Sequence, residues 1–138
     1  TAALGVNAIL IDTHTFVWAL YKSKDLSATA REAIESAGEV YVPPCSFHEI
    51  AMKHRAGKWP LPDADVRLLP QLLSRQGGLV APYTAAMAML AGALDWEHRD
   101  PFDRMIAATA IEMACPLVSK DAAFDGLDET TGWKERIW

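Results

Sequence analysis

Residues 9–15 read ILIDTHT, so three aliphatic residues run directly into a carboxylate. A short apolar run predicts a buried strand, here residues 8–11, and the apolar positions that follow predict a helix over residues 13–21. Asp12 stands at the junction between the two elements. Its side chain could serve as a helix cap by accepting free backbone N–H groups, or it could belong to a functional site at the end of the strand.

Short apolar runs and longer amphipathic segments continue to alternate beyond this stretch. We predict further strands at 40–42, 79–81 and 117–119, and a short edge strand near 136–138. We predict helices from Ser27 or Thr29 to residue 37 and at 46–55, 63–76, 84–93 and 102–113. Pro70 should kink or divide the helix that contains it, and Gly38 and Gly57 should end the helices before them. This alternation indicates an α/β fold with a central, mainly parallel sheet of four or five strands, flanked by helices.

The composition is typical of one soluble globular domain that spans residues 1–138. Hydrophobic residues make up 51% and charged residues 22% of the chain, and no segment has the length or purity of a membrane span. Residues 1–6 lack the features of a secretory signal, and Cys45 and Cys115 are typical of free thiols in a reducing, cytoplasmic compartment. The net charge of -5 excludes broad electrostatic binding of nucleic acid, so any such binding must be local.

Acidic residues follow the predicted strand ends at four separate places. Asp12 follows the first strand, Glu49 lies in the first turn of the helix after the second strand, and Asp103 lies in the first turn of the last long helix. Asp121 comes just after the fourth strand. Because ligands of parallel sheets bind outside the carboxyl ends of the strands, we expect these four side chains to point toward one edge of the sheet.

Each of these acids also has a purely structural alternative. Ser46 and Glu49 match the S-x-x-E capping box, in which the glutamate turns back to its own helix start. Asp100 could cap the helix that follows it, Asp103 could favour the dipole of that helix, and Asp121 could cap a turn. The histidines lack the spacing of zinc ligands and are expected to be surface or packing residues. Independent caps gathered on one sheet edge explain the pattern less simply than one shared site does.

Carboxylates gathered at one place need a counter-charge. Two bare carboxylates about 4 Å apart repel each other by about 4 kcal/mol at an effective dielectric constant near 20, so the group must take up protons or cations. Oxygen ligands select magnesium or manganese, which also engage phosphate oxygens. We therefore predict a site for one or two Mg²⁺ or Mn²⁺ ions, with Asp100 orienting the ligands. The predicted ligands are Asp12, Glu49, Asp103 and Asp121.

Two other folds that begin with a similar strand fail on their motifs. A haloacid-dehalogenase-like phosphatase needs a second acid two residues after Asp12, where this chain has His14. A nucleotide-binding Rossmann domain needs a glycine-rich turn after the first strand, and residues 13–15 supply none.

Four short segments, distributed over nearly the whole chain, share their order and spacing with a known family. They are LIDTHTFVWAL at 10–20, SFHEIAMKHRAGKWPLP at 46–62, HRDPFDRMIAATA at 98–110 and PLVSKDAAF at 116–124. The chain resembles the PIN domain family, and within it the VapC toxin-like ribonucleases of bacterial toxin–antitoxin pairs. This resemblance implies a three-layer fold, endoribonuclease activity that depends on a divalent metal, a homodimer, and a cognate antitoxin protein with a tail that masks the active site.

The resemblance also assigns roles to individual residues. It places the family's catalytic acidic quartet on the same four carboxylates and gives Thr13 a place beside the first of them.

The basic residues that could bind the RNA are Lys53, Arg55, Lys58 and Arg104. The structural alternative for the first three is a solvated helix end. We expect the tryptophans Trp18, Trp96, Trp133 and Trp138 to serve packing rather than base stacking. The alternative function is a catalytically silent PIN-like module that binds a partner protein or RNA.

Overall fold

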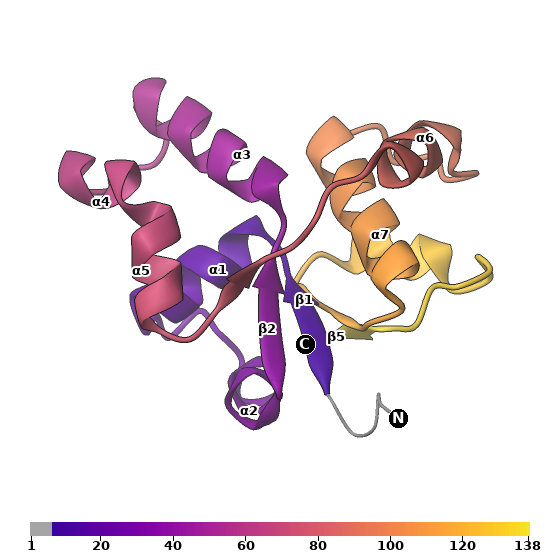
Figure 1. Cartoon of the computed structure of the whole chain (residues 1–138), viewed down its shortest axis with the longest axis horizontal. Coiled ribbons are helices and arrows are strands. Elements are labelled where there is room, and N and C mark those ends of the chain that lie inside the picture. The colour runs from indigo at the N-terminus through magenta and orange to yellow at the C-terminus, as the bar shows by residue number, and fades with distance from the viewer. Residues whose placement is uncertain (1–6) are drawn as a thin grey trace.

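A computed structural model describes residues 7–138 as an alternation of helices and strands (Figure 1). In chain order the elements are β1 (Ala8–Ile11), α1 (Thr13–Leu20), α2 (Ala28–Ser36), β2 (Glu39–Val42), α3 (Pro44–Arg55), α4 (Asp63–Arg67), α5 (Leu69–Arg75), β3 (Leu79–Val80), α6 (Ala85–Ala93), α7 (Pro101–Met113), β4 (Leu117–Val118), the 3-10 helix η1 (Ala122–Leu127) and β5 (Arg136–Ile137). Residues 1–6, where we expect no secretory signal, lie outside the described part of the chain.

The strands form a five-stranded sheet in the order β3-β2-β1-β4-β5. Every pairing in it is parallel, with β1 in the centre; Ile9 lies opposite Val40 of β2, and Leu10 lies opposite Leu117 of β4. The expected parallel sheet of four or five strands is therefore confirmed. Because the strands run the same way, the residues that follow β1, β2 and β4 emerge at one edge.

Helices cover both faces of this sheet and make the fold three-layered. Leu10 is buried in one apolar cluster with residues of α7 and η1, whereas Ile9 and Ile11 are buried in a second cluster with residues of α1, α2, α3 and α5. Successive strand residues point to opposite faces, so each layer has its own core. Figure 1 shows α6 and α7 on one side of the sheet and α1 and α5 on the other. This arrangement confirms the expected α/β class.

Most element boundaries agree with the sequence, and two predictions at helix ends are wrong. Helix α3 begins at Pro44 after the N-cap Pro43, which makes no side-chain cap hydrogen bond, so Ser46 does not open a capping box. Helix α2 ends before Ala37, which is extended, and Gly38 is not left-handed. The predicted left-handed end at Gly57 is confirmed by its φ of +75°.

The predicted division near Pro70 is also confirmed. Helix α4 ends at Arg67 and α5 begins at Leu69, with Pro70 in its first turn. Proline has no N–H to donate and fits only the start of a helix. The segment expected at 63–76 is therefore two helices.

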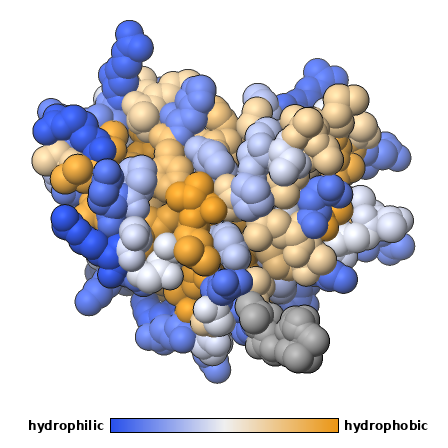
Figure 2. Space-filling model, viewed as in Figure 1, coloured by the Kyte–Doolittle hydropathy of each residue, from blue (hydrophilic) through white to orange (hydrophobic). Residues whose placement is uncertain are grey.

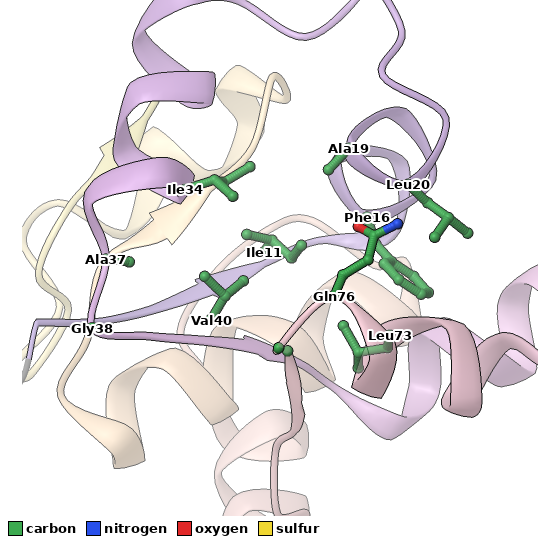
Figure 3. A pocket seen from close by; sticks show the side chains of 12 residues that line it. Ile11, Phe16, Ala19, Leu20, Ile34, Ala37, Gly38, Val40, Leu73 and Gln76 are labelled. Atoms are coloured by element: carbon green, nitrogen blue, oxygen red, sulfur yellow. The ribbon is translucent and has the colours of Figure 1, made fainter.

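An apolar patch and an apolar hollow lie near the edge of the sheet that ends at β3. The edge strand β3 exposes Leu79 and Val80, and Figure 2 shows the patch over this strand. A hollow of about 190 Å³ lies against the sheet between α1, α2 and α5, where Phe16, Ile34 and Leu73 line it (Figure 3). Apolar surfaces of this kind are often covered by partner proteins. Within residues 7–138, no helix is long and apolar enough to cross a bilayer.

Candidate functional site

Asp12 is a helix cap and also a buried acid. One of its oxygens accepts a hydrogen bond from the backbone N–H of Thr15 at 3.0 Å, and the other accepts one from the Ser119 hydroxyl. The side chain is only 7% exposed. Burial raises the pKa of Asp12, while the hydrogen bonds from Ser119 and Thr15 act in the opposite direction. The capping role and a functional role are thus compatible at this residue.

Ser119 links Asp12 to Asp121. The Ser119 hydroxyl oxygen accepts a hydrogen bond from the backbone N–H of Asp121 at 3.1 Å while the hydroxyl donates to Asp12. Asp121 caps η1 by accepting from the backbone N–H of Ala123 at 2.9 Å, and its side chain is exposed. Asp12 and Asp121 line the same hollow, so the acids after β1 and β4 meet as predicted.

Asp103 belongs to the same group through Asp121 and His98. The Nε2 atom of His98 lies 2.6 Å from Oδ2 of Asp103. One ligand atom each from His98, Asp103 and Asp121 lies within 4.8 Å of the others. The pKa of Asp103 is raised to about 6, chiefly by burial and also by the charges of Asp100 and Asp121, against the hydrogen bond from His98.

Asp100 positions this part of the site from the start of α7. Its side chain accepts hydrogen bonds from the backbone N–H groups of Phe102 at 2.8 Å and Asp103 at 3.3 Å. The predicted cap is therefore present. It fixes the backbone from which the Asp103 carboxylate projects, and its own charge adds to the local negative potential.

Glu49 reaches the same edge from α3. It is 7% exposed, and its Oε2 lies 2.6 Å from Nζ of Lys53, one turn later on α3. The half-buried thiol of Cys45 on α3 lies 3.8 Å from the backbone carbonyl oxygen of Phe102 on α7, so the helices that carry Glu49 and Asp103 pack against each other. Burial raises the pKa of this thiol to about 12, and the charges of Glu49 and Asp103 act in the same direction.

The hydroxyl of Thr13 holds α1 and α3 together. Its Oγ1 lies 2.8 Å from Oγ of Ser46, and both residues are buried. Thr13 therefore pairs with a residue of the Glu49 helix rather than with the carboxylate of Asp12. The contact joins the start of α1, directly after Asp12, to the helix that carries Glu49.

Comparison with known proteins identifies the family to which this arrangement belongs. The family model described as PIN domain matches residues 9–129. The chain belongs to the PIN domain family. A curated relative, Ribonuclease VapC22 of Mycobacterium tuberculosis, is 32% identical over 118 residues, which cover 84% of this chain and 88% of the relative.

Solved structures share the fold of this PIN domain. VapBC2 from Rickettsia felis, bound to a DNA fragment from its promoter, matches with a TM-score of 0.65 at 16% identity and covers 95% of this chain and 99% of its own. VapBC-5 from Mycobacterium tuberculosis matches with a TM-score of 0.62 at 19% identity and covers 94% and 97%. At these identities the likeness shows the fold alone.

The four basic residues that we expected to bind RNA differ in how free their charged groups are to meet a phosphate. The guanidinium of Arg104 donates hydrogen bonds to the backbone carbonyls of Ala91, Leu94, Trp96 and His98 at 2.6–2.9 Å. These bonds occupy its donors and argue against the phosphate-binding role we expected. Lys53 pairs with Glu49 and lies 5.2 Å from the ring centroid of Trp59. Arg55 and Lys58 are exposed.

Two polar contacts of the site were missed by the sequence prediction. His98 was expected to be a surface or packing residue, yet it contacts the Asp103 carboxylate. Its position shortly before the acidic first turn of α7 is a signal that could have indicated this contact. Ser119 was assigned only to the end of a strand, although a hydroxyl beside Asp121 at a strand end is well placed to join neighbouring loops.

Proposed function

We propose that this PIN domain is an Mg²⁺- or Mn²⁺-dependent endoribonuclease and the toxin of a toxin–antitoxin pair. The observation that carries the proposal is the convergence of acids from distant parts of the chain at one sheet edge. Those acids are Asp12, Asp103 and Asp121, together with Glu49 on α3, the helix that packs against α7. The relative from Mycobacterium tuberculosis is a ribonuclease by name, which supports the same class of reaction.

The chemistry of these side chains fits a hard divalent cation. Burial raises the pKa of Asp12 and of Asp103, which means that their ionised forms lack sufficient solvation or counter-charge. Oxygen ligands suit magnesium and manganese, and one or two ions would relieve the repulsion among the acids. When bound, such an ion supplies an activated water nucleophile at neutral pH and stabilises the charge of phosphate oxygens.

The protein residues would bind and orient in this reaction. Ser119 and the N–H of Thr15 fix the Asp12 carboxylate, and Ser119 also fixes the backbone of Asp121. His98 holds one oxygen of Asp103 and leaves its other oxygen for a ligand. Neighbouring groups that orient ligands in this way strengthen metal binding. The scissile phosphate would lie over the acids, outside the carboxyl ends of the strands.

Partners of the chain follow from the same proposal. RNA is the substrate, Arg55 and Lys58 are exposed cations that can meet its phosphates, and a cognate antitoxin protein masks the site. Two of the solved structures with this fold, VapBC2 and VapBC-5, support a partner of this kind, since VapBC-5 is a member of the VapBC family of toxin–antitoxin systems. We further propose that the chain forms a homodimer and works in the cytoplasm.

Cleavage of RNA is the test. Purified protein with a mixed RNA pool and Mn²⁺ is expected to cut internally, and EDTA is expected to stop the cutting. Asp12→Asn should abolish cleavage while the unfolding temperature stays nearly unchanged, because Asn caps helices as well as Asp. Uncut RNA that still binds the protein would favour the catalytically silent module. Full, metal-dependent activity of Asp12→Asn would remove this residue from the mechanism.

A further inference from the structure

A hollow of about 290 Å³ adjoins the acids, and its lining is not that of a metal site alone. Asp12 and Asp121 form one part of it, and His14, Trp18 and Lys120 form the rest. Two rings and a cation thus share a cavity with two of the proposed metal ligands. Neither ring is needed to hold an ion.

Trp18 is held in place by other rings. It is half-buried on α1, with ring centroids 5.8 Å from Trp138 and 5.5 Å from His14. His14 is exposed and meets the ring of Trp59 edge-on at 5.0 Å. These contacts fix the orientation of the ring, and the surface of Trp18 that lines the hollow is free to contact a ligand.

Two other tryptophans, Trp96 and Trp133, have different surroundings. Trp133 is 8% exposed and stacks on Phe124 with centroids 6.2 Å apart. Trp96 donates its Nε1–H to the backbone carbonyl of Ala123 at 3.2 Å. Both serve packing, as expected from the sequence, whereas Trp18 combines packing with a place beside the acids.

Lys120 supplies a positive charge at the same place. Its Nζ lies 5.9 Å from the ring centroid of Trp18, its side chain is exposed, and it directly precedes Asp121 in the chain. A cation over an aromatic ring is a weak interaction at an exposed site. The flexible lysine stem can therefore leave the ring and meet a backbone phosphate.

We propose that this hollow is a nucleobase subsite, in which Trp18 stacks one unpaired base next to the scissile phosphate, His14 contacts the edge of that base and Lys120 binds a neighbouring phosphate. The inference rests on the proposed ribonuclease function and extends it. Aromatic rings combined with cations are the usual means of binding single-stranded nucleic acid. The subsite requires a splayed-out base, so the substrate is single-stranded RNA or a loop.

Steady-state cleavage of a short single-stranded RNA in Mn²⁺ tests the subsite. Stacking contributes about 1–3 kcal/mol per base, so Trp18→Ala should raise KM by about 5- to 150-fold, and Trp18→Phe should recover most of the loss. Tyr21→Ala is the matched control, because Tyr21 is an exposed ring directly after the end of α1 that donates a hydrogen bond to Asp65 instead. Its KM should equal that of the wild type. Lys120→Gln should reduce the slope of log KM against log salt by about 0.7.

Substrates that lack single bases make the test independent of folding. Replacing each base in turn by an abasic residue should reveal one position at which the wild-type KM rises about as much as in Trp18→Ala. The same replacement should have no further effect in Trp18→Ala. An abasic series with no sensitive position, or an unchanged KM in folded Trp18→Ala, would overturn the subsite while leaving the nuclease intact. Absence of any cleavage by the wild type would instead defeat the proposed function.

Discussion

Asp103 is an acid whose protonation falls within the ordinary working range of pH. Burial and the charges of Asp100 and Asp121 raise its pKa to about 6, even though the hydrogen bond from His98 lowers it. A protonated carboxyl group is neutral and a poor metal ligand. Ion binding at this site should therefore weaken as the pH falls through about 6, and removing His98 should move that loss to higher pH.

Calorimetric titration with Mn²⁺ at a series of pH values checks this expectation. In the wild type the affinity should fall by about tenfold for each pH unit well below the pKa of Asp103. In His98→Ala the fall should begin at higher pH, because a contact that lowers the pKa of Asp103 is lost. The control is His48→Ala, which removes an exposed histidine of α3 and should follow the wild-type curve. An affinity that is independent of pH around 6 would contradict the assignment of Asp103 as a ligand.

Single residues differ in how well the sequence predicted their place. The four acids were predicted together, because each follows a strand end or opens a helix and parallel strands gather such positions at one edge. His98 and Ser119 were not predicted, since His98 acts through a hydrogen bond to Asp103 and Ser119 acts through hydrogen bonds to Asp12 and Asp121. Those bonds depend on loop geometry, which sequence periodicity does not contain.

Helices α1 and α3 are joined by a buried hydroxyl pair that the sequence could not reveal. Thr13 and Ser46 are 33 positions apart and meet at 2.8 Å. The sequence pattern predicted instead that Ser46 caps its own helix, but α3 already begins at Pro44, two residues earlier. The Ser46 hydroxyl therefore makes a long-range contact with Thr13, whereas the capping-box pattern had predicted a local contact at the start of its own helix.

A double-mutant cycle measures this contact. Thr13→Val and Ser46→Ala should each lower the free energy of unfolding by about 1–3 kcal/mol, because each change leaves the hydroxyl of the other residue buried without a hydrogen-bond partner. The double variant should cost less than the two single costs combined, since neither partner then remains unsatisfied. Urea denaturation gives all the values needed. Additive costs would mean that the hydroxyls do not interact in solution.

The connection between α6 and α7 depends on Arg104. Its guanidinium binds carbonyls of both the end of α6 and the loop that carries His98. Lysine cannot reproduce this fork of donors. The conservative change Arg104→Lys should therefore disturb the loop that places His98 beside Asp103.

Arg104→Lys is expected to lower the free energy of unfolding by about 3 kcal/mol, because buried carbonyls lose their donors. RNA cleavage should fall with it, through the displaced His98. Arg99→Lys is the matched control: Arg99 lies in the same loop but is exposed, so its change should stay within about 0.5 kcal/mol. Equal stability of the two variants in denaturant melts would refute the structural role of Arg104.

At the scale of the whole molecule, the alternation of strands and helices was sufficient to predict the architecture. Helices on both faces require strands that are buried on both sides, and β1 with Ile9, Leu10 and Ile11 meets that requirement. The same parallel direction brings the acids to one edge. The alternation could not predict which side chains line the hollows beside that edge, because those side chains come from separate parts of the chain.

Crystals of this chain soaked in Mn²⁺ offer the most direct measurement of the shared metal centre. The account predicts an anomalous-scattering peak roughly 2.0–2.3 Å from carboxylate oxygens of Asp12 and of Asp103 or Asp121, and the loss of that peak in Asp12→Asn. A protein that cleaves RNA while its Mn²⁺ binds elsewhere, or nowhere near these side chains, would contradict it.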